Sequence, residues 1–313
     1  MIPKLDILRD RGTMLSRSRQ FFVDRSVLEV DCPILSASAS VDAHIDLIPA
    51  TPIDGKRFLH SSPEYSMKRL LSSGIGDIFQ LSHVFRNGES GSKHNPEFTM
   101  AEWYRVGFTF PEIIEETIDY CRLFLGDLPS ESITYRQAFL KYAGIDYLGI
   151  SEIELLKFLE RKEITVYPEI AKEGKEALLN LVLGLIIEPH LGKHSLCALT
   201  HYPASQAALA KALRIHDEDV AERFEIYHQG VELANGYHEL CDATEQRFRL
   251  IEANKMRLQM GKEELPIDEN FLTALENGLP ECCGVAVGFD RLMMLRHKTS
   301  QIADVIPFVW SNA

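Results

Sequence analysis

Residues 85–104 read FRNGESGSKHNPEFTMAEWY, a polar loop between two segments that favour β-structure. Strands are predicted over residues 78–85 and 98–104, because both are rich in apolar and aromatic side chains and the loop between them is rich in Gly, Ser and Asn. The loop carries three basic side chains, Arg86, Lys93 and His94. A hairpin of this kind directs several cations to one point, which suits a triphosphate.

The returning strand carries a carboxylate among apolar neighbours. A strand period of two places four side chains on one face, Phe98, Met100, Glu102 and Tyr104. A buried glutamate between such neighbours is costly unless a cation pairs with it. Glu102 is therefore a candidate ligand for a cation, although this segment alone is equally compatible with a solvent-exposed face.

A second hairpin is predicted over residues 223–240, with its turn near Gln229-Gly230. Glu225 and Glu232 are expected to face each other across it, and two facing carboxylates repel unless a metal ion or an ammonium group lies between them. Oxygen ligands of this kind suit Mg²⁺, which binds through one or two carboxylates and substrate phosphates. An ordinary acidic hairpin is the alternative.

The second strand of this hairpin carries three polar side chains that alternate onto one face, Asn235, Tyr237 and Glu239. Strict alternation places Glu232 on the opposite face from Asn235. A β-bulge near Asn235-Gly236 is therefore required if both are to contribute to one site.

Residues 284–292 read GVAVGFDRL, which predicts a strand of small residues over 284–288 and then a helix. Small residues let a ligand approach the backbone closely. Asp290 opens the helix and its first turn presents Arg291, which can stack on a base and still donate to a phosphate. A helix-capping Asp beside a surface Arg is the alternative.

The rest of the pattern predicts an α+β fold, a mixed and mainly antiparallel sheet flanked by helices. No internal repeat or low-complexity linker marks a boundary, so one domain is expected over residues 1–313. The other expected elements are a helix over 5–25, a strand over 27–30, a helical stretch over 151–190, and helices over 244–260, 269–277 and from Asp290.

Composition excludes several classes of protein. The 313 residues carry a formal net charge of −13, which disfavours general binding of nucleic acid, since phosphate neutralisation supplies most of that affinity. No apolar run is long enough to cross a membrane, and the N-terminus lacks an apolar signal core, so a cytoplasmic protein is expected. The six cysteines form no CxxC pair and are interpreted as reduced structural thiols. No P-loop and no GxGxxG motif are present.

Four ordered segments together resemble the class II aminoacyl-tRNA synthetases. Residues 19–36, with Pro33, resemble motif 1 of that family, and residues 85–100 resemble the lysyl form of motif 2. Residues 284–291 resemble motif 3, and residues 232–240, ELANGYHEL, are similar to the lysine-pocket strand of lysyl-tRNA synthetases. The resemblance covers the chain from about residue 5 onward.

A narrower resemblance is to the elongation factor P–lysine ligase family, truncated paralogues of lysyl-tRNA synthetase. Almost nothing precedes motif 1, so we expect no anticodon-binding domain. Residues 61–65 (SSPEY) and 202–207 (YPASQA) look like that family's versions, with Ser62 where the synthetases usually have Ala. Ala286 occupies a position that is usually Gly in the synthetases.

The resemblance implies ATP and Mg²⁺ as cofactors and assigns residues to a nucleotide site. Arg86 and Arg291 would be the catalytic pair. Arg86 would bridge the α-phosphate and the substrate carboxylate, and Arg291 would hold outer phosphates with His94 and enclose adenine against Phe98. The further nucleotide-site residues would be Asn95 and the two Mg²⁺ ligands, Glu225 and Glu232.

The resemblance also implies an amino-acid pocket. Glu64 would receive the substrate's backbone-side amine, and the distal ammonium would be bound by Glu102, Tyr104 and Glu239. The remaining pocket residues would be Ser62, Asn235, Tyr237 and Ala286. Ser62 and Ala286 are the two that favour (R)-β-lysine over α-lysine in this interpretation.

As partners, the resemblance implies elongation factor P as acceptor and a homodimer formed through motif 1, with tRNA not expected as acceptor. A stand-alone lysyl-tRNA synthetase core and a catalytically weakened regulatory paralogue are the alternatives. One position departs from the family pattern, since Gly88 stands where motif 2 usually has a glutamate and Glu89 follows it.

Overall fold

The computed structural model describes residues 3–38 and 40–313. Met1, Ile2 and Ala39, which the predicted domain of residues 1–313 includes, lie outside the described residues. The chain forms two compact units. Unit 1 comprises Met1–Asp127 and Gly236–Ala313, and unit 2 comprises Leu128–Asn235. Each is described separately.

Unit 1 contains a mixed sheet in the order β1-β5-β6-β12, in which β1 is parallel to β5 and the other pairs are antiparallel. A small antiparallel sheet, β2-β4-β3, accompanies it. The strands of unit 1 are β1 (Leu28–Glu29), β2 (Leu35–Ser36), β3 (Ile48–Ala50), β4 (Arg57–Leu59), β5 (Ile78–Phe85), β6 (Glu97–Val106) and β12 (Cys282–Gly288). Its helices are α1 (Lys4–Val23), α2 (Glu64–Ser72), α3 (Phe110–Leu125), α8 (Ala243–Gln259), α9 (Glu269–Glu276) and α10 (Phe289–Arg296).

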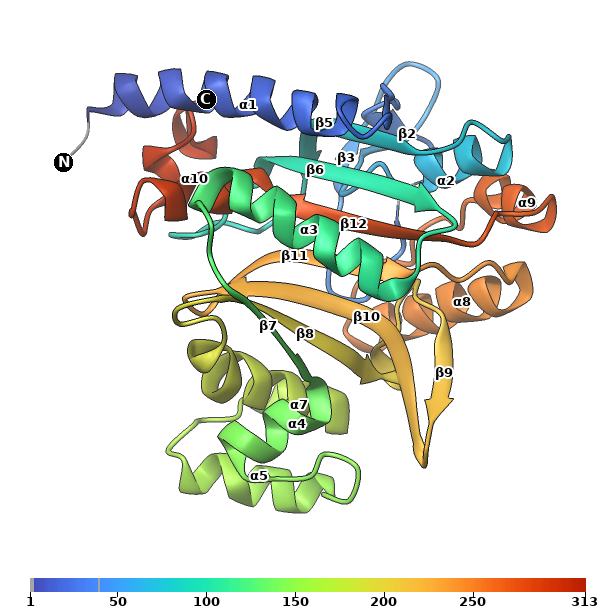
Figure 1. The fold of residues 1–313 in the computed structure, drawn as a ribbon. Helices are drawn as coiled ribbons and strands as arrows, with labels where there is room; N and C mark the ends of the chain where they lie inside the picture. The colour runs from blue at the N-terminus through green and yellow to red at the C-terminus, as the bar shows by residue number, and fades with distance from the viewer. Residues whose placement is uncertain (1–2, 39) are drawn as a thin grey trace. The chain divides into compact units, whose positions relative to one another are not determined.

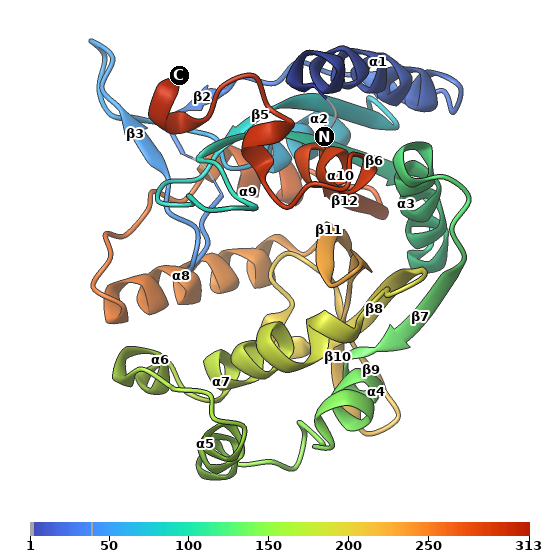
Figure 2. The same cartoon turned by 90° about the vertical axis from the view of Figure 1, so that its left-hand side faces the viewer.

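The two faces of this sheet differ in chemistry. Trp103 of β6 packs against Phe22 of α1 and Tyr120 of α3, with ring centroids 5.1 and 5.3 Å apart, so these helices cover an aromatic face (Figure 1). Figure 2 shows α1 and α3 against the strands from a second direction. The other face carries the predicted row of Phe98, Met100, Glu102 and Tyr104, because side chains alternate along β6.

Unit 2 also has a mixed, mainly antiparallel sheet. Its strands are β7 (Ser130–Thr134), β8 (Leu196–Pro203), β9 (Ala212–Ile215) and β10 (Glu218–His228), with the first part of β11 (Val231–His238). β8 and β9 pair antiparallel with β10, and β7 pairs parallel with β8. Its helices are α4 (Tyr135–Ala138), α5 (Glu152–Arg161), α6 (Pro168–Lys172) and α7 (Lys175–Val182).

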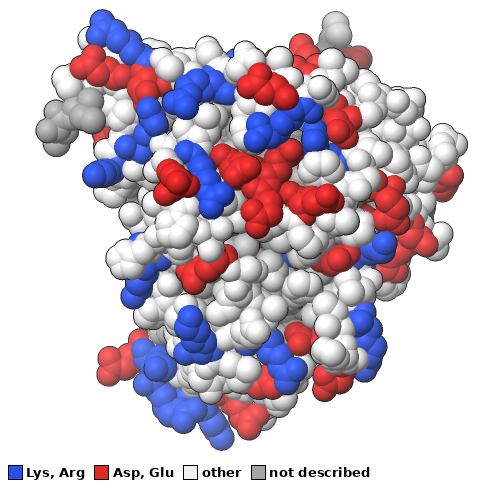
Figure 3. Space-filling model, viewed as in Figure 1, with Lys and Arg blue, Asp and Glu red and all other residues white. Residues whose placement is uncertain are grey.

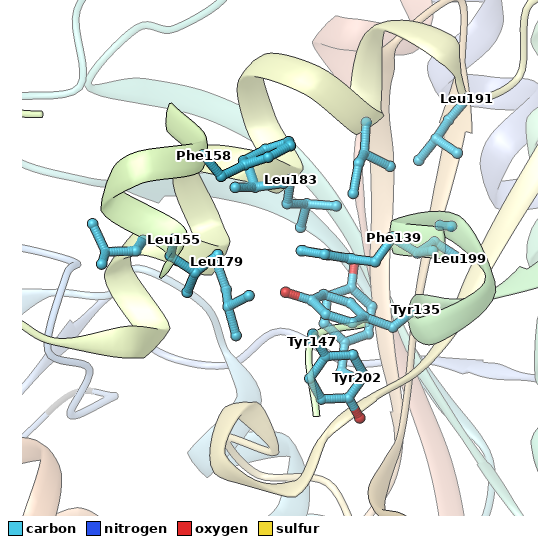
Figure 4. Close-up of a cluster of buried hydrophobic side chains, with 14 of the residues drawn as sticks. Tyr135, Phe139, Tyr147, Leu155, Phe158, Leu179, Leu183, Leu191, Leu199 and Tyr202 are labelled. Atoms are coloured by element: carbon cyan, nitrogen blue, oxygen red, sulfur yellow. The ribbon is translucent and has the colours of Figure 1, made fainter. Parts of the chain in front are cut away.

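The core of unit 2 is an apolar and aromatic cluster between its sheet and helices (Figure 4). Leu155 and Leu159 of α5 and Leu178 and Leu179 of α7 are buried there, as expected for helices that bury one apolar stripe. Tyr135 and Phe139 stack within the cluster with centroids 4.4 Å apart.

The predicted α+β fold class is confirmed, and most predicted elements appear near their expected bounds. The strands over 78–85, 98–104 and 284–288 are β5, most of β6 and most of β12. The helical stretch over 151–190 is divided into α5, α6 and α7. These are followed by a π-helical turn (Leu183–Ile187) and a 3₁₀ turn (Glu188–His190).

The expectations for membrane crossing, for the cysteines and for charge can each be compared with the structure. Within the described residues, no helix is long and apolar enough to cross a membrane. All six cysteines are free and five of them are buried, which agrees with structural thiols. Acidic and basic side chains are intermingled on the face shown in Figure 3.

Candidate active site

A cluster of buried carboxylates lies in unit 1. Glu64 at the start of α2, Glu102 on β6 and Glu239 just after β11 are 8%, 2% and 1% exposed. Lys68 of α2, one helical turn after Glu64, is fully buried beside them. Its Nζ lies 2.7 Å from Oε1 of Glu64 and 2.6 Å from Oε2 of Glu239. We call Glu64, Lys68, Glu102 and Glu239 the carboxylate pocket.

Glu102 has separate partners in this pocket. Ser62 Oγ donates to its Oε2 at 2.7 Å, and Tyr104 Oη donates to its Oε1 at 2.8 Å. Burial raises the pKa of Glu102 to about 8, repulsion from Glu64 adds to the rise, and the two hydroxyls oppose it. The alternative that this face of β6 is exposed to solvent is therefore wrong. A cation bound beside Glu102 would stabilise its ionised carboxylate.

The small residues of β12 make room beside this cluster. The register places Gly284 opposite Tyr104 and Ala286 opposite Glu102. A Cβ atom on Gly284 would lie 2.3 Å from the Tyr104 ring and 2.4 Å from Oε1 of Glu239. Glycine is thus required at 284 by close approach, and Ala286 is the next side chain along the same face.

The loop after β5 brings Arg86 to a half-buried position. Its guanidinium lies over the Phe98 ring, 5.2 Å from the centroid. Among the described residues, its buried Nε has no hydrogen-bond partner. A buried donor left unpaired in the protein is costly, so this atom is suited to an acceptor from a ligand.

Gly88, the departure from the family pattern, has a φ of +77°. This conformation favours glycine, because a side chain there would strain the backbone. Glu89 follows it, and its Oε1 lies 3.7 Å from NH1 of Arg86. A carboxylate is therefore present in the loop one residue later than the family pattern has it.

His94 and Arg291 lie together although they are far apart in sequence. Arg291 NH2 is 2.8 Å from His94 Nε2. Burial lowers the pKa of His94 and the positive charge of Arg291 lowers it further. A neutral imidazole that accepts from Arg291 explains this contact, since the guanidinium can only donate.

Asp290 anchors the start of α10. Its Oδ2 accepts from the backbone N–H of Thr99 at 2.7 Å, and its Oδ1 forms a buried ion pair with Arg11. Gly288, and not Asp290, occupies the N-cap position. The helix-capping alternative for Asp290 is therefore wrong, and the carboxylate ties α10 to α1 and β6.

Asn95 is buried and its amide is used within unit 1. Its Nδ2 donates to the Glu97 carbonyl at 2.6 Å, and its Oδ1 accepts from the Trp310 N–H at 2.9 Å. The Asn95 side chain thereby fixes the loop between β5 and β6 against the C-terminal segment. A direct contact between Asn95 and a nucleotide stays a prediction.

Unit 2 contains a different arrangement around Glu225, which is 6% exposed. Its Oε2 accepts from Tyr202 Oη at 2.6 Å and from Tyr227 Oη at 2.5 Å. Its Oε1 accepts from Arg223 NH2 at 2.6 Å, and Arg223 Nε also donates to Asn235 Oδ1 at 3.3 Å. We call Glu225, Tyr202, Tyr227 and Arg223 the hairpin cluster.

The hairpin turns where the sequence predicts, at Gln229 and Gly230, whose φ angles are +51° and +69°. A two-residue turn pairs Tyr227 with Glu232, so Glu225 and Glu232 share a face as diagonal neighbours. Both tyrosines of the hairpin cluster experience the charge of Glu232. A register shift lies in β10 between Ala221 and Phe224, but it belongs to the pairing of β10 with β8. The bulge near Asn235-Gly236 in β11 stays a prediction.

The described residues contain no group of three or more His, Cys, Asp and Glu side chains that could hold a metal ion. Two carboxylates are nevertheless sufficient for Mg²⁺ when phosphates complete its coordination. Glu225 and half-buried Glu232 are oxygen donors of this kind.

Sequence reasoning missed Lys68 and Arg223. It placed Gly284 in a strand of small residues but did not predict its close approach to Tyr104 and Glu239. A signal existed for Lys68, because it stands four residues after Glu64 in a helix and such residues are neighbours on one face. Similarly, Arg223 and Glu225 are two residues apart in a strand and share a face. The predicted pocket residue Tyr237 is half-buried on β11.

Comparison with known proteins agrees with this geometry. The family described as tRNA synthetases class II (D, K and N) matches residues 4–312. The chain belongs to this family. An elongation factor P–(R)-β-lysine ligase of Proteus mirabilis (strain HI4320) is 44% identical over 307 residues, 96% of this chain and 94% of the relative. The class II synthetase fold expected from the motifs is thereby confirmed.

Two further relatives have the same name. The protein of Salmonella typhi is 42% identical over 312 residues, 98% of this chain and 95% of its own length. The protein of Haemophilus influenzae (strain PittGG) is 42% identical over 319 residues, 99% and 98% of the two chains. These matches confirm the resemblance to the elongation factor P–lysine ligase family.

Proposed function

We propose that this chain is an ATP-dependent ligase that activates (R)-β-lysine as an adenylate and transfers it to a lysine side chain of elongation factor P. The carboxylate pocket is the observation that carries the proposal. When its three carboxylates are ionised, the single ammonium of Lys68 leaves two negative charges uncompensated among the described residues. A substrate with two ammonium groups neutralises both. The names of the relatives support the same substrate and acceptor.

The reaction needs no nucleophilic side chain. The substrate carboxylate attacks the α-phosphorus, and pyrophosphate leaves with the electron pair of the broken P–O bond. The acceptor amine then attacks the adenylate carbonyl, loses a proton, and AMP leaves. The protein contributes position and charge. Arg86 would bind the α-phosphate and the substrate carboxylate, and its unpaired Nε supports this role.

Arg291, His94 and Phe98 would hold the nucleotide. A neutral His94 can donate from Nδ1 to a phosphate while its Nε2 accepts from Arg291. Phe98 offers a half-buried ring for adenine. The guanidinium plane of Arg291 can stack on the other side of the base.

Glu225 and Glu232 fit Mg²⁺ by the chemistry of their oxygen atoms, and we propose them as its protein ligands. When bound, Mg²⁺ neutralises phosphate charge. The hydroxyls of Tyr202 and Tyr227 hold the Glu225 carboxylate in position. Arg223 occupies Oε1 of Glu225, so metal binding requires this ion pair to lengthen or to share its oxygen.

A single catalytic domain over residues 1–313 and a cytoplasmic homodimer formed through residues 19–36 complete the proposal. The class II family match spans both compact units, which supports one catalytic domain. The net charge of −13 supports a protein acceptor over tRNA.

Two assays test the proposal in sequence. ATP–pyrophosphate exchange is first measured with (R)-β-lysine and with α-lysine, and exchange that depends on either amino acid is expected. The labelled amino acid is then offered to elongation factor P and, separately, to lysine tRNA. Labelling of elongation factor P alone is the expected result. Labelling of tRNA alone would establish a synthetase core, and no exchange with either isomer would establish an inactive paralogue.

A further inference from the structure

Lys68 is an unusual residue for the wall of a cation-binding pocket. It is fully buried, projects from the second turn of α2 and contacts carboxylates from two segments far apart in sequence. Burial alone would lower the pKa of Lys68, but attraction from Glu239 and Glu64 raises it above its ordinary value. The side chain therefore remains an ammonium.

A role in packing alone explains this arrangement poorly. Replacing a buried ion pair by apolar side chains of similar volume is often neutral or stabilising, so burial of a charge is weak evidence for a contribution to stability. Lys68 instead contacts one oxygen of each carboxylate, at 2.7 and 2.6 Å, and thereby sets where both lie. Both carboxylates are proposed to bind the substrate.

We infer that Lys68 is a positioning residue of the amino-acid pocket, a built-in ammonium that fixes the Glu64 and Glu239 carboxylates in place for a substrate with two ammonium groups. The inference rests on the proposed function, since it concerns how that pocket receives its amino acid. Lys68 itself does not touch the reacting atoms.

The charges around Glu239 determine the effect of removing Lys68. Burial raises the pKa of Glu239, the ammonium of Lys68 lowers it, and repulsion from Glu64 raises it again. His238, paired with Glu281 at 2.8 Å, opposes the rise, and Glu239 is itself close enough to raise the pKa of Glu102. Lys68 also interacts with three uncharged groups: the Phe271 ring of α9, the Tyr65 hydroxyl and the Cys282 thiol. The charge of Asp268, at the start of α9, acts on Tyr65 as well.

Lys68→Met keeps the side chain as far as Cε and removes the charged Nζ. The pKa of Glu239 then rises further, so its acid form persists to higher pH and must lose a proton before a cation binds. In pyrophosphate exchange, KM for the amino acid should rise about tenfold or more near pH 7. The increase should shrink as the pH is raised to about 9, whereas KM for ATP should remain unchanged.

Lys56→Met is the matched control, because Lys56 forms an exposed ion pair with Glu263 in the same unit. It should leave both KM values and their pH dependence unchanged. An unchanged amino-acid KM in Lys68→Met would overturn the inference. An increase that does not diminish with pH, or that also affects ATP, would assign Lys68 a merely structural role and overturn it too.

A measurement on the unmodified protein decides the matter if Lys68→Met does not fold. Binding of (R)-β-lysine near pH 8 is measured by calorimetry in two buffers of different ionisation enthalpy. Release of about half a proton, mainly from Glu102, is expected, because Lys68 limits the pKa of Glu239 to about 7 and most of that carboxylate is ionised at this pH. Release of about one and a half protons would overturn the inference. Absence of any binding would instead count against the proposed function.

Discussion

The carboxylate pocket of unit 1 and the hairpin cluster of unit 2 both bury glutamates, but they balance the charge differently. In the pocket, three carboxylates lie with the single ammonium of Lys68 among the described residues, and that ammonium contacts only Glu64 and Glu239. In the hairpin cluster, Glu225 alone has the guanidinium of Arg223 and two tyrosine hydroxyls. The first cluster has more carboxylates than cations, and the second is already satisfied.

This difference indicates what each cluster can bind. An uncompensated buried charge is costly, so the pocket is best completed by a cationic ligand. The hairpin cluster has no such need by itself, and a metal ion becomes favourable there only when Glu232 and phosphate oxygens add their charge. Burial alone therefore does not identify a binding site, whereas the balance of charges around it does.

Glu239→Gln should have the largest effect, because it removes one carboxylate of the pocket and leaves Lys68 with Glu64 alone. Truncating one partner of a buried charge pair costs about 2–5 kcal/mol. This corresponds to a loss of roughly thirtyfold to several thousandfold in kcat/KM for the amino acid. Pyrophosphate exchange measures it, with binding of ATP largely intact.

The matched control is Glu263→Gln, an exposed carboxylate that pairs with Lys56. Surface pairs of this kind contribute little, so exchange should be unaffected. Unchanged kinetics in Glu239→Gln would show that the amino-acid pocket has been assigned to the wrong place.

The pH dependence of amino-acid binding should be the next largest effect. Burial raises the pKa of Glu102 to about 8, so below this pH the free pocket holds a proton that a cationic substrate must displace. The affinity should fall as the pH decreases, by about fiftyfold between pH 8 and pH 6 and by about tenfold per pH unit well below the pKa. Titration of KM for (R)-β-lysine measures it.

Glu102→Gln provides the comparison, since an amide cannot titrate. Its affinity for the amino acid should be lower throughout and should depend on pH less steeply, because only Glu239, whose pKa burial raises to about 7, still titrates in this range. A slope of the same size in the variant would assign the titration to another group.

Tyr202→Phe tests the hairpin cluster by removing one hydroxyl donor from Glu225 while keeping the ring that lies 4.4 Å from the Arg223 guanidinium. Partners that orient a metal ligand typically contribute about ten- to a hundredfold to metal affinity. The Mg²⁺ concentration for half-maximal exchange should rise by that amount.

Tyr147→Phe is the matched control, because Tyr147 donates to Glu218 and not to the cluster. Its Mg²⁺ dependence should match that of the unmodified protein. An equal response of the two variants would remove the support for a metal site at Glu225.

The hairpins of this protein could be predicted from local sequence. Alternation over residues 78–85 and 98–104 and the Gln229-Gly230 turn each depend on neighbouring residues alone. Helix α3 was not predicted, although Thr109 and Glu112 form a capping box that signals its start.

The charge balance of the two clusters could not be predicted in the same way. Lys68 and Glu239 are brought together only by the fold, and Gly284 is required only because Tyr104 and Glu239 approach it. The family resemblance named the carboxylates but not the ammonium between them. Contacts between residues distant in sequence leave no periodic pattern, so these residues needed the structure.

The smallest effect is expected from Ala286→Gly, which enlarges the pocket by one methyl group and leaves its charge unchanged. Ala286 lies opposite Glu102 in the sheet. Its methyl group should crowd the α-carbon of α-lysine, which bears an amine. The α-carbon of (R)-β-lysine is an unsubstituted methylene and tolerates the contact. A change of one methyl group contributes about 1–3 kcal/mol, so the preference for (R)-β-lysine should decrease by about tenfold and α-lysine should gain activity. Competition of the two isomers in pyrophosphate exchange measures the ratio of their use.

Ala212→Gly, the same change on exposed β9, should leave this ratio unaltered. Equal use of both isomers by the unmodified protein would contradict this role for Ala286, because no preference would remain for the methyl group to explain.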